Sequence, residues 1–371
     1  MKLKGKDFIL GFQHLFAMFG ATVLVPALTG LSVSSTLLFA GLGTLLFHLV
    51  TGRKVPAFLG SSFAFLGGYF AVSALCQENG ITNFSAYAGV GVACAGLVYV
   101  VLAILFKIFG AGRVMKYFPP VVTGPIIIAI GLTLSSTAIS SCSDNWIIAL
   151  IAVLVVIVCN IWGKGMVKII PILLGVIISY LSAVVMGKVD FTAVREAAWI
   201  GLPVATLDET VFSLFKSCNT SVLITSIITI MPIALATIIE HIGDVSAISS
   251  TVGKNFIANP GLHRTLIGDG CATAMAALFG APANTTYGEN TGVLALTKVY
   301  DPRVIRIAAI FAVLLSFSPK FAAIISAMPT ATMGGISLVL YGMISAVGVR
   351  NVVENRVDFS KSRNVIIAAL I

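Results

Sequence analysis

Long apolar segments alternate with short polar connections along the whole chain. Most of these segments have the ~20 residues that an α-helix needs to cross the hydrocarbon core of a bilayer. They cover residues 12–28, 36–52, 56–75, 85–108, 118–139, 146–163, 169–187, 220–243, 264–280, 283–297, 304–327 and 329–348, and a thirteenth begins near residue 364. The pattern predicts an all-α polytopic membrane protein. Because the thirteenth segment stops at Ile371, we expect the last spans to be missing from this chain.

Composition and charge agree with this pattern and give an orientation. The chain is 58% hydrophobic and 10% charged, with a mean hydropathy of +1.05, whereas roughly a quarter of the residues of a soluble protein are charged. With a cytoplasmic N-terminus, 19 of the 23 Lys and Arg residues lie in cytoplasmic segments, and the exceptions are Lys188, Arg195, Lys216 and Lys320. The positive-inside rule requires such a bias.

The orientation also accounts for the net charge. A charge of +9 that follows the cytoplasmic segments, without a basic run longer than two residues, argues against nucleic acid as a partner. We expect a multi-pass protein of the cytoplasmic (plasma) membrane that contacts the lipid bilayer. Its first helix is expected to be retained and not cleaved as a signal peptide, because a dozen further spans follow.

Two short motifs occur twice. Pro119 and Gly124 open the fifth span with the spacing that Pro329 and Gly334 have in the twelfth. The polar stretch Gly60-Ser61-Ser62-Phe63 in the third span resembles Asn284-Thr285-Thr286-Tyr287-Gly288 in the tenth. Both pairs are seven spans apart, so the second copy crosses the membrane in the opposite sense. The repeats predict a 14-span protein built from 7+7 inverted repeats, an architecture of many secondary transporters.

The two polar stretches are expected to be extended segments inside spans 3 and 10. Extended backbone at membrane depth is tolerated only where protein buries it or where it lines a cavity. If the two spans cross, the segments can pair with each other and present backbone donors to a ligand. The alternative is that Ser and Thr side chains bond to a neighbouring turn and that both spans stay helical.

Three acids lie within apolar surroundings. Glu240 and Asp244 are four residues apart, which places them on one helix face, and Glu289 lies in the tenth span. Acids at membrane depth are costly and mark ion or substrate pathways. Asp244 has an alternative as an interfacial residue beyond the end of its helix. Asp269 is either part of the site or bonded to a neighbouring helix, and His241 is a packing or supporting residue.

Other functional classes fit the sequence less well. An anion transporter favours helix N-termini and a basic residue, and a channel needs a continuous polar lining that most spans lack. The spacing Glu240-His241-x-x-Asp244 is not the HExxH zinc motif, and neither Cys nor His residues show metal-ligand spacing. We expect neither an enzyme nor a metal or organic cofactor.

Several motifs resemble the nucleobase–ascorbate transporters, also called nucleobase:cation symporter-2, and among them the bacterial uracil permeases. They are QHLFAMFGATVLVP (13–26), PAFLGSSFAF (56–65), EHIGD (240–244), NPGLHR (259–264), NTTYGENTGV (284–293) and MGGISLVLYG (333–342). The resemblance implies homodimers, formed through gate domains, that move substrate by an elevator-type shift of core against gate. The core domain would comprise residues 1–110 (spans 1–4) and 220–327 (spans 8–11). The gate domain would comprise 111–219 (spans 5–7) and 328–371 (span 12 and the start of 13).

The resemblance also implies a site. The base would lie between spans 3, 8, 10 and 12, where Glu240 and Glu289 accept hydrogen bonds from its ring N–H groups. The backbone N–H groups of Phe63 and Gly288 would serve its carbonyl oxygens. The other implied residues are Tyr287 and Tyr341 as lining, with Asn290, His241 and Asp269 as possible support.

One position departs from the uracil-permease pattern, and it bears on coupling. Asp244 stands where that pattern has His, and xanthine and ascorbate relatives often have Asp there, so a xanthine or other purine permease is the alternative to a uracil permease. Two acids one turn apart in a low dielectric cannot both ionise cheaply. We therefore expect Glu240 and Asp244 to share a proton that serves as the coupling ion for uptake.

Overall fold

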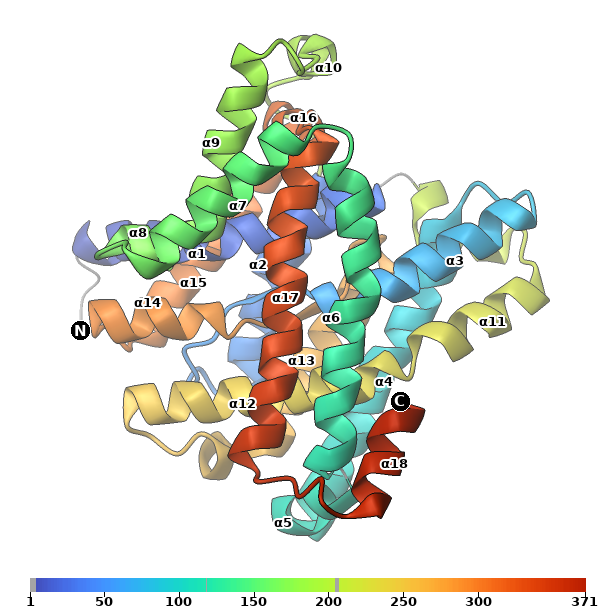
Figure 1. Ribbon diagram of the computed structural model, residues 1–371, viewed down its shortest axis with the longest axis vertical. Helices are drawn as coiled ribbons and strands as arrows, with labels where there is room; N and C mark the ends of the chain where they lie inside the picture. The colour runs from blue at the N-terminus through green and yellow to red at the C-terminus, as the bar shows by residue number, and fades with distance from the viewer. Residues whose placement is uncertain (1–4, 118, 204–206) are drawn as a thin grey trace.

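The structure is a computed structural model that describes residues 5–117, 119–203 and 207–371 (Figure 1). Almost all of its regular structure is helical, with two short strands. The elements are α1 (Gly5–Thr29), α2 (Val33–Val50), β1 (Leu59–Ser61), η1 (Phe63–Phe65), α3 (Leu66–Glu78), α4 (Phe84–Phe109), α5 (Ala111–Val114), η2 (Met115–Tyr117), α6 (Pro120–Cys142), α7 (Trp146–Ile161), α8 (Met166–Ile169), α9 (Pro171–Val185), α10 (Thr192–Glu196), η3 (Leu207–Glu209), η4 (Val211–Phe215), α11 (Thr220–Ile230), α12 (Ile233–Val252), η5 (Ile257–Gly261), α13 (Leu262–Leu278), β2 (Asn284–Thr286), α14 (Glu289–Thr297), α15 (Pro302–Ser316), α16 (Pro319–Ser326), α17 (Thr330–Glu354) and α18 (Ser362–Leu370).

Several of these helices are long and apolar enough to cross a membrane. Within the described residues there are six such helices, or seven if the bent pair α15 and α16 counts as one span. Two shorter apolar helices, α7 and α9, add to them. These helices agree with a helical multi-pass protein.

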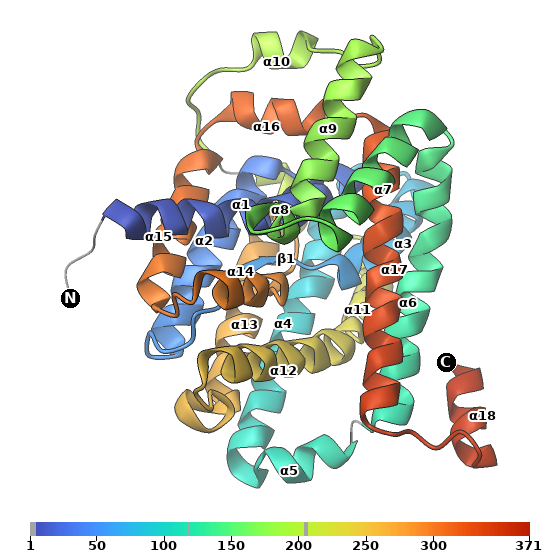
Figure 2. The ribbon, with the colours of Figure 1, turned by 60° about the vertical axis from the view of Figure 1, so that its left-hand side comes forward.

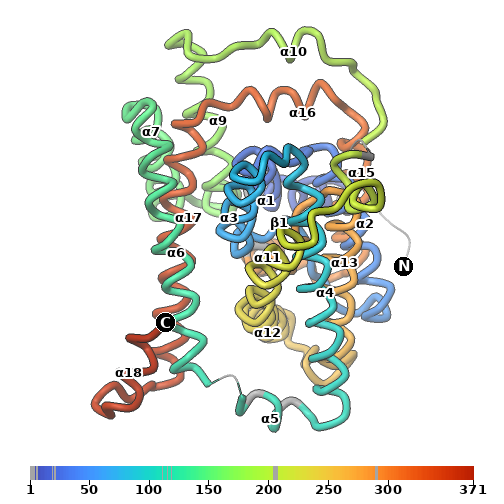
Figure 3. The backbone as a smooth tube through the Cα atoms, turned by 90° about the vertical axis from the view of Figure 1, so that its right-hand side faces the viewer, coloured from blue at the N-terminus to red at the C-terminus, as the bar shows by residue number. Residues whose placement is uncertain are grey.

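The helices form two groups that are visible from the side (Figures 2 and 3). Helices α6, α7, α9 and α17 stand on one side, and α1 to α4 and α11 to α15 stand on the other. Short helix α5 lies in the connection between the groups at one end, while α10 and α16 lie across the opposite end. A substrate bound between the two groups would touch both.

The repeated Pro–Gly motif opens two helices that pack against each other. Gly124, near the start of α6, contacts Val352 near the end of α17, and a Cβ on Gly334, near the start of α17, would lie 2.6 Å from the backbone N of Cys142 at the end of α6. At Gly348 an added Cβ would lie 2.7 Å from the backbone N of Ile128. Helices α6 and α17 therefore run antiparallel, and glycine allows their close approach.

The two extended segments are confirmed. Strands β1 and β2 form one antiparallel pair in the register Leu59↔Thr286, Gly60↔Thr285 and Ser61↔Asn284. Each strand is followed directly by helix, η1 and α3 after β1 and α14 after β2. Spans 3 and 10 are thus interrupted, and the alternative of uninterrupted helices is wrong.

Two helix boundaries differ from the sequence-based expectation. The segment 304–327 was expected to be one span, but α15 and α16 are bent by 87°. The bend occurs because Ser318 caps α16 by accepting a hydrogen bond from Phe321 N, and Pro319 follows as its first residue. Helix α12 continues to Val252, where Gly253 ends it in the left-handed conformation, well beyond the expected end at residue 243.

Candidate functional site

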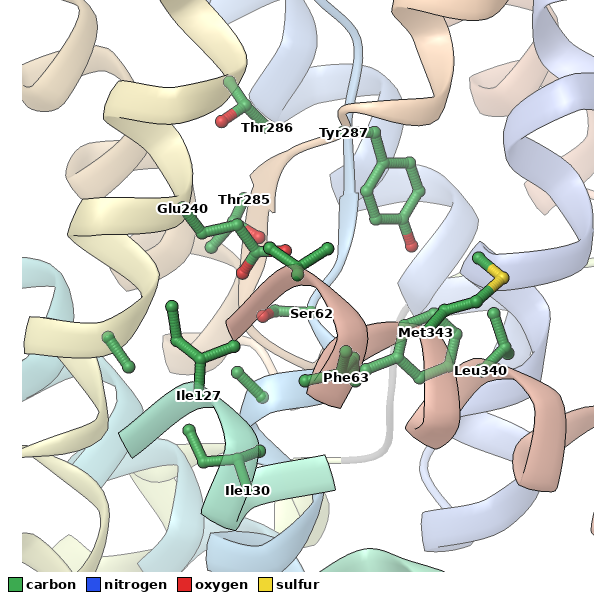
Figure 4. A pocket seen from close by; sticks show the side chains of 14 residues that line it. Ser62, Phe63, Ile127, Ile130, Glu240, Thr285, Thr286, Tyr287, Leu340 and Met343 are labelled. Atoms are coloured by element: carbon green, nitrogen blue, oxygen red, sulfur yellow. The ribbon is translucent and has the colours of Figure 1, made fainter. Parts of the chain in front are cut away.

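A cavity of about 120 Å³ lies between the two groups of helices (Figure 4). Its polar wall comes from η1 and the residue before it, from α12, and from β2 and the residue after it. Its apolar wall comes from α6 and α17. The lining residues are Ser62, Phe63, Ala64, Ile127, Ile130, Ala236, Glu240, Thr285, Thr286, Tyr287, Leu340, Met343, Ile344 and Val347. A small cavity that is mostly apolar and has a few convergent polar groups is typical of a small-molecule site.

Glu240 is the acid of this cavity. Its side chain leaves α12 and points toward Ser62 and Thr285 (Figure 4). Asp244 lies one turn further along the same helix and well before its end at Val252. The alternative that Asp244 follows the end of its helix is therefore wrong, because the helix continues for two more turns.

Asp244 faces Gly288. A Cβ on Gly288 would lie only 2.5 Å from Asp244 Oδ1, so any side chain at this position would displace the carboxylate. This close approach links Asp244, which is expected to take part in proton coupling, to Gly288, the residue before α14. A glycine at residue 288 thus has a packing reason in addition to any role of its backbone N–H.

Two helix N-termini lie at the polar wall. Phe63 is the first residue of η1, which continues into α3, and Gly288 is the N-cap residue of α14. The first N–H groups of a helix have no acceptor within the helix and carry a partial positive charge. The wall therefore places the start of one helix, at Phe63, in the same cavity as the acceptor Glu240, and the start of the other, at Gly288, directly after the lining residue Tyr287.

Side chains of surrounding helices hold the two strands in place. Thr44 of α2 accepts from Leu59 N at 2.9 Å, and the Tyr69 hydroxyl of α3 accepts from Ala283 N at 3.0 Å. The Tyr287 hydroxyl donates to the carbonyl of Ser61 at 2.5 Å and joins the end of β2 to β1. These contacts provide the hydrogen bonds that extended backbone needs at membrane depth.

His241 and Asp269 form a buried pair behind the strands. Both side chains are fully buried, and His241 Nδ1 lies 2.5 Å from Asp269 Oδ2. The same carboxylate accepts from the Thr286 backbone N and hydroxyl at 3.3 Å, and the hydroxyl also lies 2.9 Å from His241 Nδ1. Asp269 is therefore bonded to neighbouring elements, α12 and β2, and orients Thr286 at the cavity wall.

The remaining expected residues divide into two sets. Tyr287 lines the cavity, whereas Tyr341 is buried in a different hollow with Ser337 and Phe70. Glu289 begins α14 and Asn290 follows it, but the side chains of both lie outside the described part of the structure. The cavity therefore contains Phe63, Glu240 and Tyr287 of the expected residues, with Gly288 next to it.

The sequence-based reasoning missed the apolar wall. Ile127 and Ile130 of α6 and Leu340 and Met343 of α17 face the polar groups across the cavity (Figure 4). In the sequence, the Pro–Gly repeat marks α6 and α17 as related helices. It does not indicate which face of each helix lines the cavity. Among the side chains that the structure describes, no three His, Cys, Asp or Glu residues are grouped in a way that could hold a metal ion.

Comparison with known proteins identifies the family. The family model Xan_ur_permease, described as "Permease family", matches residues 5–371. The chain belongs to this family. The uracil permease of Bacillus caldolyticus is 42% identical over 376 residues, which cover 99% of this chain and 84% of the relative. The uracil permease of Escherichia coli (strain K12) is 39% identical over 373 residues, with 98% and 82% covered.

Solved structures agree on the fold. The transmembrane domain of the cyanobacterial bicarbonate transporter BicA matches with a TM-score of 0.68 at 15% identity, covering 94% of this chain and 95% of the other. The likeness to this transporter concerns the fold alone. Together, the family model and the relatives establish a multi-pass permease and confirm the family that the motifs indicated.

Proposed function

We propose that this permease takes up uracil across the cytoplasmic membrane together with protons. The observation that carries the proposal is the cavity in which Glu240 lies beside the N-terminal residues of two interrupted spans. Relatives about 40% identical over nearly the whole chain bear the name uracil permease, which supports this substrate.

The polar wall is complementary to uracil. The ring is flat, and N–H donors alternate with carbonyl acceptors along its edge. Glu240 would accept from a ring N–H, and the backbone N–H groups of Phe63 and Gly288 would donate to the carbonyl oxygens. Glu289 would accept from the second N–H. The ring faces would pack against Phe63 and against the apolar wall from α6 and α17.

Coupling would reside in the pair of acids on α12. Glu240 and Asp244 are one turn apart, so one of them would hold a proton when the cavity is closed to water. The proton would enter with the base and leave with it on the inner side. Glu240 would then connect the two events, because it contacts the base and shares the proton.

Transport would follow from movement of one group of helices against the other. The cavity lies at their boundary, with polar residues from one group and apolar residues from the other. We propose that residues 1–110 and 220–327 form a core domain that carries the base, and that residues 111–219 and 328–371 form a gate domain through which two copies associate. The antiparallel packing of α6 and α17 and the β1–β2 pair support a 14-span inverted repeat with a cytoplasmic N-terminus.

Uptake of labelled uracil into proteoliposomes, with pH and sodium set separately inside and outside, tests this function. Labelled uracil should accumulate when the outside is more acidic, should be indifferent to a sodium gradient at equal pH, and should be displaced by unlabelled uracil more strongly than by xanthine or guanine. Stronger displacement by xanthine would assign a purine permease instead. Accumulation that follows sodium and ignores pH would contradict proton coupling.

A further inference from the structure

A second pocket, separate from the Glu240 cavity, lies among three connections of the helix group that comprises α1 to α4 and α11 to α15. It is open, has a volume of about 520 Å³ and shares no lining residue with that cavity. Arg53 and Lys54 follow α2, Lys254 follows α12, and Pro302 begins α15. The other lining residues are Asn255, Phe256 and Asn259. Three cations, two after α2 and one after α12, thus converge on one hollow although these segments are far apart in sequence.

These cations have no acidic partner in the described structure. Salt bridges within 4.0 Å involve neither Arg53, Lys54 nor Lys254 among the residues that the structure describes. Lys54 Nζ donates to the neutral Asn259 Oδ1 at 2.6 Å, which ties the connection after α2 to η5. The pocket therefore combines positive charge with polar amide groups.

A further guanidinium lies beside the pocket. Arg306 follows Pro302 by one turn on the same face of α15, and Arg53 is among the charges that act on it. Its Nη1 is buried, and among the described residues it has no hydrogen-bond partner. The residue as a whole is partly buried, and Asp301 also acts on its charge. A buried N–H without an acceptor is nevertheless costly, and an anion in the pocket would reduce that cost.

The carboxylate of Asp301, next to Pro302, is already engaged. Asp301 accepts from the backbone N of Arg303 at 2.9 Å and pairs with its guanidinium at 2.5 Å. The hydrogen bond from the Arg303 side chain holds the pKa of Asp301 below its usual value, so the carboxylate stays ionised beside Arg303. It is therefore not available to neutralise Arg53, Lys54 or Lys254.

The backbone conformation of Arg53 also holds this residue at the pocket. Arg53 has a φ of 60°, in the left-handed region that non-glycine residues seldom adopt. Its backbone N bonds to the carbonyl of His48 at 2.6 Å and closes the end of α2. This turn fixes an arginine at the mouth of the pocket, where Gly would adopt the same φ more easily.

We propose that this pocket binds a phosphate group. Clustered Arg and Lys side chains with amide donors are the groups that bind phosphate oxygens in proteins. The positive-inside rule accounts for basic residues on this side of the membrane. It requires neither their convergence nor a buried guanidinium nitrogen without an acceptor next to them. The phosphate belongs either to an anionic lipid headgroup or to a soluble phosphate compound.

Thermal unfolding of the purified full-length protein tests the site and separates the two sources. One arm compares nanodiscs of phosphatidylcholine alone with nanodiscs that contain phosphatidylglycerol. The other arm adds inorganic phosphate to the phosphatidylcholine nanodiscs, with sodium chloride at equal ionic strength as reference. The double variant Arg53→Gln/Lys254→Gln is compared with Arg113→Gln/Lys116→Gln, which removes two exposed cations elsewhere on the expected cytoplasmic side.

We expect Tm to rise with at least one probe in the wild type and in the Arg113/Lys116 variant, and the rise to be lost in the Arg53/Lys254 variant. A rise with phosphatidylglycerol alone identifies a lipid site, and a rise with inorganic phosphate identifies a soluble ligand. Equal rises in all three proteins, or no rise in the wild type with either probe, would overturn the proposal. Uracil binding in detergent shows whether the Arg53/Lys254 variant is folded, since neither residue touches the cavity.

Discussion

Removal of the Asp269 carboxylate is expected to damage the site through β2 and not through direct contact with substrate. Asp269 is fully buried, lies 2.5 Å from His241 Nδ1 and accepts from Thr286 N and Oγ1 at 3.3 Å. Removing one partner of a buried pair costs about 3–5 kcal/mol. Asp269→Ala should therefore lower the free energy of unfolding by about that amount and weaken uracil binding, because Thr286 loses its anchor.

The isosteric substitution provides a graded comparison. Asp269→Asn keeps the shape and one acceptor, so each hydrogen bond changes from charge-assisted to neutral, a difference of about 1–1.5 kcal/mol per bond. It should fall between wild type and Asp269→Ala in unfolding by denaturant or heat in detergent, and in the dissociation constant for uracil. Asp208→Ala, at an exposed acid, is the control. Two results would refute the claim that Asp269 anchors Thr286. One is an Asp269→Ala protein as stable as the wild type, and the other is an Asp269→Asn protein whose stability and uracil binding are as low as those of Asp269→Ala.

Three further substitutions test other parts of the site. Gly288→Val should weaken uracil binding by about tenfold, since overpacking costs about 1–3 kcal/mol and a Cβ would lie 2.5 Å from Asp244 Oδ1. An unchanged dissociation constant in a binding titration would contradict this. Asp244→His should preserve uracil binding but shift the pH dependence of uptake toward neutral pH, because His has the higher ordinary pKa. A pH profile of uptake identical to that of the wild type would exclude Asp244 from coupling. Gly348→Leu should destabilise the protein by about 1–3 kcal/mol through overpacking of α17 on α6, measurable as a lower Tm; a wild-type Tm would disprove the close approach.

Much of the fold could be predicted from hydrophobic pattern alone. Apolar length predicted a helical multi-pass protein, and long apolar helices such as α2, α4 and α6 agree with it. The polar residues around Ser61 and Thr285 indicated the two strands, because unpaired backbone in a membrane needs another strand or a cavity. The bend at Ser318 was visible as a Ser-Pro pair but lay inside an apolar run. Hydropathy does not distinguish a continuous span from a helix that turns by 87°.

The site was predictable in part. Glu240 could be assigned because charge at membrane depth is rare, and the family resemblance implied Phe63; both line the cavity. Tyr341 could not be placed, since a sequence does not give the rotation of α17, which directs Leu340 and Met343 to the cavity and Tyr341 away from it. The bonding of Asp269 to His241 depends on the packing of α12 against α13, which no local pattern encodes.

The central claim is that Glu240 binds the base and couples its uptake to protons. Accumulation of labelled uracil in proteoliposomes under an inward proton gradient tests it most directly, with Glu240→Gln compared with wild type and with Glu354→Gln, a substitution at the surface of α17. Glutamine retains the shape and a neutral acceptor, so binding should weaken by about tenfold, while accumulation above the external concentration should disappear. The Glu354→Gln protein should accumulate uracil as the wild type does. Gradient-driven accumulation at the wild-type level by Glu240→Gln would contradict the mechanism.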